Sequence, residues 1–255
     1  MLRIPLPTTS RRGRLVVQAG HGDLSTQLDD ASRRWGGSSR LYVASGLLAV
    51  ATLLAFQVDL AVLDFMRNGG LRGDLRRVVE FSEVFAHGFG IGLILLTIVV
   101  LDPTRLWAVP RMLACSFGSG IAVDVVKLLI GRTRPRDHEF ATVWDSFQGW
   151  VPMLGSGGTG DALNSSIQSF PSGHAATAVG LAVALSYLYP RGRWLFGLYA
   201  VLAAVQRLHV GAHFFSDTLA GAAIGCLIAG LCCDSARCGK WFDRLEASRG
   251  RDSTN

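Results

Sequence analysis

The chain has 255 residues, of which 49% are hydrophobic and only 17% are charged, and its formal net charge is +6. Soluble globular domains have about 25% charged residues, and here the apolar residues are gathered into blocks long enough to cross a bilayer. This composition excludes an ordinary soluble protein. The five cysteines form no paired framework in the loops between the blocks, which excludes a disulfide scaffold and a zinc site of the Cys-x-x-Cys type.

Six apolar blocks of 18 to 20 residues follow one another along the chain, and a transmembrane helix needs about 20 such residues. The blocks are residues 41–58, 84–101, 112–131, 172–189, 194–212 and 214–233. They predict an all-α fold, a bundle of six transmembrane helices over residues 41–233. A disordered basic tail is expected at residues 1–40 and a second tail at residues 234–255.

The distribution of basic residues predicts the orientation of these helices. With both termini on one side, 16 of the 25 Lys and Arg residues fall on that side, in the two tails and in the turns at 102–111 and 190–193. Cytoplasmic loops carry the excess of Lys and Arg, so we expect a multi-pass protein of the plasma (inner) membrane with cytoplasmic termini. This accounts for the positive charge without nucleic acid as a partner.

Two longer segments are then expected on the outer face, towards the periplasm or exterior. Residues 71–85 have apolar positions at near-helical spacing among charges, which predicts a short helix in the membrane interface. Residues 132–170 are expected to form a loop. Its Gly-rich run at 155–160 is weak evidence for phosphate binding, because no strand precedes it and no Gly-Lys-Ser/Thr sequence follows it.

Three groups of residues that could bind a ligand or catalyse a reaction fall at this outer face. The first is a pair of cations. Lys127 and Arg134 are seven residues apart and would share a helix face if the helix reached Arg134, although Pro135 discourages a longer helix. Two cations pointing the same way suit an anion. The alternative is that Lys127 pairs with Asp124 while Arg134 extends to lipid headgroups.

The second group opens the fourth block with the sequence Pro171-Ser172-Gly173-His174. Proline favours the first turn of a helix, and the free backbone N–H groups that follow it make an anion site. His174 would then lie beside a bound phosphate. The alternative is a capped helix with an interfacial histidine.

The third group surrounds the short turn between the fifth and sixth blocks. His213 and Asp217 are four residues apart, so at a helix start the carboxylate can hold one imidazole nitrogen as N–H and leave the other free to attack. This is the arrangement of an activated nucleophile. Arg207 is six residues before His213 and cannot share its helix face, so the chain has to turn, with Gly211 as the natural place. The alternative is that Asp217 only neutralises an awkward membrane histidine.

In this order, Lys-x6-Arg-Pro, Pro-Ser-Gly-His and Arg-x5-His-x3-Asp resemble the motifs of the type 2 phosphatidic acid phosphatase (PAP2) family. This family consists of membrane lipid phosphatases related to the vanadium haloperoxidases. The resemblance runs from about residue 41 to residue 233. One position departs from the family pattern: Gln206 stands where the third motif usually has Ser before the Arg, which can alter phosphate geometry or substrate choice.

The resemblance implies a role for each matching residue. It makes His213 the nucleophile that forms a phosphohistidine, Asp217 its orienting partner and His174 the general acid. The groups that bind the phosphoryl oxygens would be Lys127, Arg134, Arg207, Ser172 and the backbone N–H of Gly173. No metal or other cofactor is expected, since cations already surround the phosphate and no carboxylate cluster is present to hold Mg²⁺.

The expected activity is hydrolysis of the terminal phosphomonoester or diphosphate of a lipid phosphate. The substrates that the family suggests are phosphatidic acid, phosphatidylglycerol phosphate, a polyprenyl diphosphate and lipid A, and the sequence does not separate them. Three alternatives are a lipid phosphotransferase using the same histidine, a non-catalytic lipid-phosphate carrier and a vanadate-dependent peroxidase. The six lipid-length blocks argue against the peroxidase. The sequence does not determine the oligomeric state.

Overall fold

The computed structural model describes residues 37–137, 139–150 and 165–252. Most of the tail expected at residues 1–40 and the Gly-rich run at residues 155–160 lie outside these ranges. The residues of the three motifs all lie within them.

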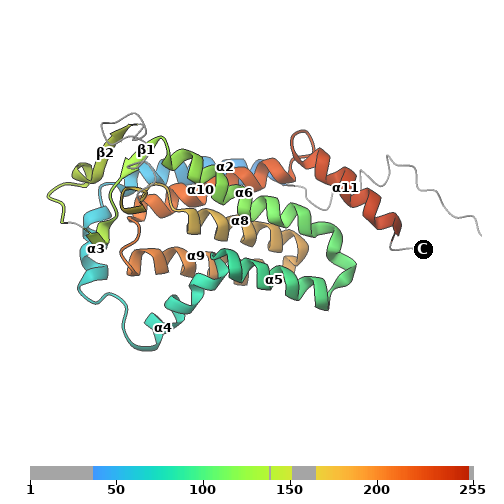
Figure 1. Cartoon of the computed structure of the whole chain (residues 1–255), viewed down its shortest axis with the longest axis horizontal. Helices are drawn as coiled ribbons and strands as arrows, with labels where there is room; N and C mark the ends of the chain where they lie inside the picture. Colours follow the sequence, from blue (N-terminus) through green and yellow to red (C-terminus); the bar gives the residue numbers. More distant parts are fainter. Residues whose placement is uncertain (1–36, 138, 151–164, 253–255) are drawn as a thin grey trace, which may run out of the picture.

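A helix covers most of each of the six apolar blocks. These helices are α2 (Ser38–Ala55), α5 (Gly88–Leu101), α6 (Val109–Lys127), α8 (Gly173–Leu188), α9 (Arg193–His209) and α10 (Phe215–Cys233). Figure 1 shows them running along the long axis of the molecule. The turns η2 (Pro103–Ala108) and η7 (Pro190–Gly192) connect them at one end, which we call the far end.

Only some of these helices are long and apolar enough to cross a membrane by themselves. Three stretches qualify, namely α2, residues 103–127 of η2 and α6, and α10. A fourth span arises if residues 73–85 and α5, which meet at a 72° bend, are taken together, and α8 is a shorter apolar helix. The six-span bundle therefore remains a prediction, while the apolar helices themselves indicate a membrane protein.

The outer surfaces of the helices are unusually apolar. On α2, Leu47 and Leu53 are each about two-thirds exposed, and on α5 Phe89 and Leu101 are about three-quarters exposed. Contiguous apolar surface of this extent is rare on soluble monomers and marks contact with a membrane or a partner. Contact with lipid explains it here.

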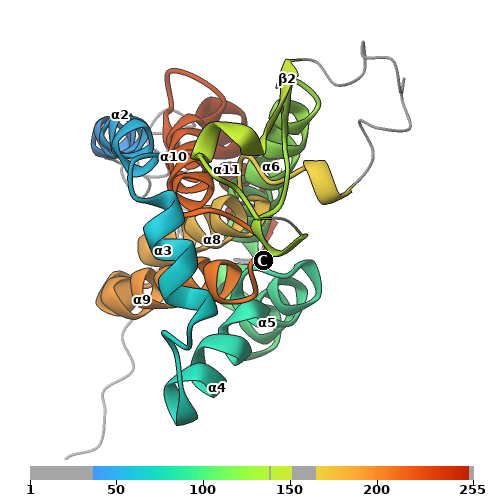
Figure 2. The ribbon, with the colours of Figure 1, turned by 90° about the vertical axis from the view of Figure 1, so that its left-hand side faces the viewer.

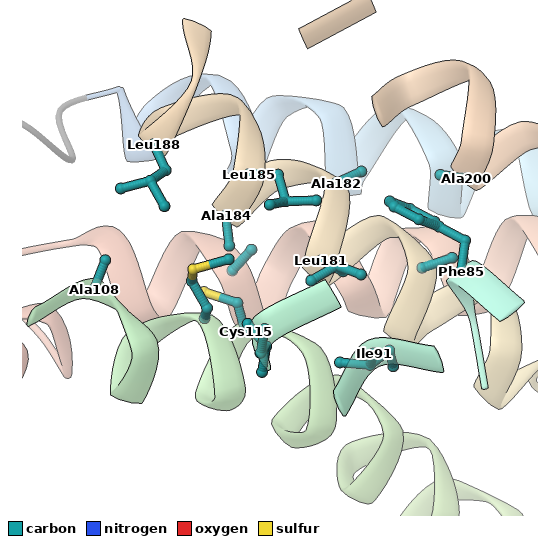
Figure 3. Close-up of a cluster of buried hydrophobic side chains, with 14 of the residues drawn as sticks. Phe85, Ile91, Ala108, Cys115, Leu181, Ala182, Ala184, Leu185, Leu188 and Ala200 are labelled. Carbon is teal, nitrogen blue, oxygen red and sulfur yellow. The ribbon is translucent and has the colours of Figure 1, made fainter. Parts of the chain in front are cut away.

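Helix α8 lies at the centre of the bundle and packs against α6, α9 and α10. Two glycines allow the helices to approach closely. A Cβ on Gly180 would lie 2.1 Å from the Cys115 carbonyl oxygen, and one on Gly221 would lie 2.2 Å from the Ser172 carbonyl oxygen. Small residues at helix interfaces let backbones approach in this way. Figure 3 shows the resulting core, in which Leu181 and Ala184 of α8 face Cys115 of α6.

Short elements cover the other end of the bundle, which we call the site end. They are α3 (Asp59–Arg67), α4 (Gly73–Phe81), η1 (Ser82–Phe85), β1 (Ile130–Arg132), η3 (Pro135–Asp137), η4 (Val143–Ser146), β2 (Phe147–Trp150) and η6 (Ser165–Ile167). A helix is thus present where residues 71–85 predict one. The loop expected over residues 132–170 instead contributes Arg132 to β1 and all of β2, which pair antiparallel. That expectation was wrong at these residues because strands of three and four residues are too short to show an alternating pattern.

The segment after residue 233, expected as a tail, contains helix α11 (Gly239–Asp252) at the far end. The Arg111 side chain of α6 is fully buried there and binds Asp243 at 2.6 Å and Glu246 at 2.8 Å. A buried cation needs such partners. This arginine therefore fastens α11 to the bundle.

Candidate active site

The structure places all three groups of predicted site residues at the site end of the bundle. Lys127 ends α6, Ser172 is the N-cap of α8, Arg207 lies in the last turn of α9, and His213 lies in the turn that leads into α10. Figure 2 looks onto this end, where α3 crosses in front of α9 and α10. The N-terminus of α8 brings backbone N–H donors to this region, and the ends of α6 and α9 bring charged side chains.

His213 is held by a carbonyl oxygen rather than by the expected carboxylate. Its Nδ1 lies 2.6 Å from the Ser169 carbonyl oxygen and 3.8 Å from Asp217 Oδ2. A carbonyl oxygen only accepts hydrogen bonds, so Nδ1 carries the proton and Nε2 keeps its lone pair. Asp217 acts one step further out, because Ser169 Oγ donates to its Oδ2 at 2.6 Å. The neutral tautomer that a nucleophile needs is therefore fixed by Ser169.

The electrostatic surroundings keep His213 neutral. Burial lowers the pKa of His213 below its usual value, the Asp217 carboxylate opposes this change, and the charges of Arg134 and Arg207 add to it. The His213 residue is only 4% exposed. A neutral imidazole with one free nitrogen is the form that can attack phosphorus.

Asp217 is itself held from several directions at the start of α10. The Phe214 backbone N–H donates to Oδ2 at 2.8 Å, which caps the helix, and Arg132 binds Oδ1. Asp217 is completely buried. Several donors on a buried carboxylate stabilise its charged form and fix its orientation.

Arg132 is a residue that the sequence motifs did not include. It is completely buried and binds Asp217, the Asp59 carboxylate at 2.8 Å and the hydroxyl groups of Ser146 at 2.9 Å and Ser216 at 2.8 Å. One side chain thus joins β1 to α3, η4 and α10. Arg132 is two residues before Arg134, and this closeness was the one sequence feature that could have suggested a place in the site. An Arg in an outer loop is usually solvated, however, so the feature is weak.

Aromatic rings surround the same guanidinium group. Its central carbon lies 5.2 Å from the ring centre of Phe56, 4.8 Å from that of Phe147 and 3.9 Å from that of Phe214. A desolvated arginine is attracted to aromatic faces. These rings and the two carboxylates explain how the charge of Arg132 is accommodated in a buried position.

The predicted phosphate-binding cations are also near the histidines, but no helix face unites them. Helix α6 ends at Lys127, and Arg134 lies beyond β1. Lys127 Nζ is 3.7 Å from the position that a Cβ on Gly173 would take, so it lies beside the first turn of α8. Lys127 also pairs with Asp124 at 3.2 Å, so the pairing weighed as an alternative is present. Asp124 is largely exposed and leaves Lys127 able to contact an anion.

The start of α8 has the geometry expected for an anion site. Ser172 Oγ accepts a hydrogen bond from the Ala175 N–H at 3.4 Å, and the Ser172 N–H donates to the Asp217 carbonyl oxygen at 2.9 Å. This second contact ties α8 to α10. His174 follows in the first turn, and its buried Nε2 has no hydrogen-bond partner among the described residues. An unpartnered nitrogen of this kind is available to a substrate.

Glu83 of η1 is a second residue that the sequence motifs did not include. Its Oε1 lies 2.6 Å from Arg207 Nη1 and 3.7 Å from His174 Nε2, and its Oε2 lies 3.1 Å from Gln206 Nε2. Gln206, the position that departs from the family motif, thus contacts the same carboxylate as Arg207. No spacing signal could reveal Glu83, because 124 residues separate it from Arg207.

The sequence is similar to known proteins. Residues 108–237 match the PAP2 superfamily. The chain is 37% identical over 125 residues to a lipid A 1-phosphatase of Rhizobium johnstonii, covering 49% of this chain and 46% of the relative. It is 32% identical over 122 residues to a lipid A 4'-phosphatase of Bacteroides thetaiotaomicron, covering 47% and 49%. The chain thus spans about half the length of the curated relatives it matches.

The crystal structure of LpxE from Aquifex aeolicus is similar with a TM-score of 0.48 and 19% identity, over 69% of this chain and 94% of that chain. The family match itself covers half of the chain and includes Lys127, Arg134, His174, His213 and Asp217. The chain belongs to the PAP2 superfamily.

Proposed function

We propose that this protein is a membrane lipid phosphatase that removes a phosphate from a lipid A-type phosphorylated glycolipid through a phosphohistidine at His213. The observation that carries the proposal is the neutral, oriented His213 with a free Nε2, in a site where Arg134 and Arg207 act on it electrostatically. The choice of lipid A over the other lipid phosphates rests on the relatives, which are named lipid A phosphatases.

In the first step, His213 Nε2 attacks phosphorus and the bond from phosphorus to the lipid oxygen breaks. His174 gives its proton to that oxygen, so the lipid leaves as a neutral alcohol. Lys127, Arg134 and Arg207 stabilise the charge on the phosphoryl oxygens, together with Ser172 and the N–H of Gly173. The products of this step are the alcohol and a phosphohistidine.

In the second step, water attacks phosphorus and the bond to His213 Nε2 breaks. His174, now neutral, takes the proton of the water, which restores both histidines and yields free phosphate. The same residues serve both steps because the water enters where the alcohol left. No residue outside those already named is needed for this cycle.

An apolar groove beside the site suits the hydrocarbon part of such a substrate. The groove has a volume of about 770 Å³ and lies between α2, α8, α9 and α10. It extends from Ala175 and Leu208, next to the site residues, to Arg40 and Arg193 at the opposite end of the helices. A pocket of this size and polarity takes an apolar ligand.

The first experiment measures phosphate release by the detergent-purified protein from lipid A, phosphatidic acid, phosphatidylglycerol phosphate and a polyprenyl diphosphate, with EDTA present. The wild-type protein is expected to release phosphate fastest from lipid A, and His213→Ala is expected to lose activity by at least about 10⁴-fold. Alkaline quenching followed by mass spectrometry should detect the phosphohistidine on wild-type protein.

The outcomes separate the candidate functions. Phosphate release by His213→Ala at the wild-type rate would exclude the phosphohistidine mechanism. Faster release from another lipid would support the proposed phosphatase activity and would show that lipid A is not the preferred substrate. Labelled phosphate that passes to an added lipid or sugar acceptor instead of water would identify a phosphotransferase.

We also propose that the site end faces the periplasm or exterior, with both termini in the cytoplasm of the inner membrane. The support is the excess of Lys and Arg in the tails and far-end turns. A topology reporter fused after Asn255 should be active on the cytoplasmic side. Activity of the reporter on the outer side would reverse this orientation.

A further inference from the structure

Glu83 approaches the site from η1, a short turn between α4 and α5 that packs against α9. The side chain is 40% exposed, and Arg207 and Gln206 each hold one of its carboxylate oxygens. The carboxylate oxygen bound by Arg207 also lies 3.7 Å from His174 Nε2. A carboxylate held by two partners is therefore aimed at the nitrogen that the proposed mechanism uses for proton transfer.

His174 needs such a partner because cations face it from the other elements. Burial of the ring disfavours its charged form most strongly, the charges of Arg207 on α9 and Lys127 on α6 add to this effect, and the rings of His213 and His87 also face it. Each of these charges opposes the protonated imidazole. A general acid must carry a proton before the reaction begins. Within the described residues, Glu83 supplies the one carboxylate within 4 Å of the His174 ring nitrogens.

Glu83 does not fill the phosphate site in doing so. It occupies Nη1 of Arg207, whereas the buried Nε of Arg207 has no partner among the described residues. Arg207 can therefore bind Glu83 through one nitrogen and a phosphoryl oxygen through another. The contact of 3.7 Å between Glu83 and His174 is longer than a hydrogen bond, and catalytic contacts of this kind commonly shorten when substrate binds.

We propose that Glu83 is a positioning residue that orients His174 for proton transfer to the lipid oxygen, and that Gln206 and Arg207 together orient Glu83. The proposal rests on the phosphatase function argued above. Once the lipid is bound and the contact between Glu83 and His174 has shortened, the Glu83 carboxylate accepts the N–H of protonated His174. When the bond from phosphorus to the lipid oxygen breaks, that proton moves to the oxygen and leaves neutral His174 beside ionised Glu83. The later attack of water returns the proton to His174.

The proposal also gives Gln206 a function. The amide nitrogen of Gln206 reaches the second oxygen of Glu83 at 3.1 Å, and a Ser side chain at this position would be too short to do so. Gln206, which replaces the usual Ser of the family motif, therefore contacts Glu83 directly, and we infer that the two residues act together. It parallels the other histidine, since His213 also has a nearby carboxylate, that of Asp217 at 3.8 Å.

The test compares Glu83→Gln with the matched control Glu80→Gln. Glu80 is one turn earlier, lies 3.8 Å from His209 Nε2 and binds Arg76, and neither partner belongs to the site. Glu83→Gln should lower kcat/KM for the lipid substrate by about 10 to 100 fold, within the range of general acid catalysis. The basic limb of its pH profile should move to lower pH, because the protonated form of His174 loses a neighbouring negative charge. Glu80→Gln should change neither quantity.

A second substrate distinguishes a role in proton transfer from a structural role. The para-nitrophenolate group of para-nitrophenyl phosphate leaves without needing a proton. The loss caused by Glu83→Gln should therefore shrink to within about threefold on this substrate. An equal loss on both substrates, or a basic limb that stays in place, would overturn the proposal.

A lower KM with an unchanged or higher kcat would also overturn it, because Glu83 would then be a competitor of phosphate. Failure of the phosphatase function itself has a different signature. If the phosphatase function fails, wild-type protein releases no phosphate from any lipid. If only the role of Glu83 fails, wild-type protein is active and His213→Ala is inactive.

Discussion

Among the residues that the structure describes, two arginines are completely buried, one at each end of the bundle, and each lies between two carboxylates. Arg132 at the site end binds Asp59 and Asp217, and Arg111 at the far end binds Asp243 and Glu246. Both guanidinium groups are equally inaccessible to solvent. The difference lies in the surroundings of the carboxylates. Asp217 lies beside His213, whereas Asp243 and Glu246 belong to α11 and lead to no described site residue.

The comparison teaches that burial of an ion pair does not by itself identify a functional residue. Breaking either pair leaves an unpaired buried charge, which costs about 3 to 5 kcal/mol of stability. Only at the site end does the arginine also bind a carboxylate that lies beside the proposed nucleophile, His213. Stability measurements should therefore give similar results for the two arginines, and activity measurements should separate them.

The largest expected effect is that of Arg132→Met. It should reduce kcat by about 10³-fold or more, because Asp217 loses its cation and the Ser169 and His213 contacts depend on that carboxylate. It should also lower stability by about 3 to 5 kcal/mol. Thermal unfolding in detergent and phosphate release on the folded fraction provide both values.

Arg111→Met is the matched control. It should cost a similar stability while kcat stays within about threefold of wild type, because α11 is remote from the site. Equal losses of activity in the two folded variants would show that Arg132 has only a structural role.

Asp217→Asn should have the next largest effect, and it includes a change in pH dependence. The carboxylate raises the pKa of His213 against the lowering effect of burial, so its removal lowers this pKa further. The attacking form is neutral, so the acidic limb of kcat/KM should move to lower pH, while kcat falls by about 10²-fold or more. Profiles of rate against pH from about 4 to 9 measure both quantities.

Asp243→Asn at the far end should leave the pH profile where the wild type has it. An acidic limb that moves to higher pH in Asp217→Asn would show that a group other than His213 sets this limb.

Asp59→Asn should have the smallest effect of the series. It removes one of the two carboxylates of Arg132 and weakens the contact of Asp59 Oδ1 with the Ser216 N–H at 2.8 Å, but it leaves Arg132 bound to Asp217. We expect kcat to fall about tenfold, because the orientation of Asp217 is loosened rather than lost. The far-end counterpart, Glu246→Gln, should not change kcat. If the Asp59→Asn variant has the wild-type kcat, then Asp59 does not affect the rate, and only Arg132 and Asp217 of this ion-pair group are needed for activity.

Local sequence patterns were sufficient to predict the six apolar helices and the three motifs. Each of the six apolar blocks coincides with a helix, and the ends of block and helix differ by at most four residues, as at the start of α5 and the end of α6. The residues that form local motifs, such as Ser172 with His174 and His213 with Asp217, are close in sequence. Signals of this kind are carried by a few neighbouring residues, so no knowledge of the fold is needed to detect them.

The missed elements had no such signal. Helix α3 has nine residues, and the strands β1 and β2 have three and four. Elements this short show less than the two or three periods that a hydrophobic pattern needs. They form because the bundle offers them partners, as when Arg132 of β1 meets Asp59 of α3.

The sequence by itself determined the class of protein, the apolar helices and the order of the three motifs, because composition, length and short spacings are properties of contiguous residues. Only the tertiary structure decided which groups meet at the histidines. Ser169 contacts His213 across 44 residues, Arg132 contacts Asp217 across 85, and Glu83 contacts Arg207 across 124. Contacts over such separations depend on how whole helices pack. A buried arginine and a solvated one look alike until that packing is known.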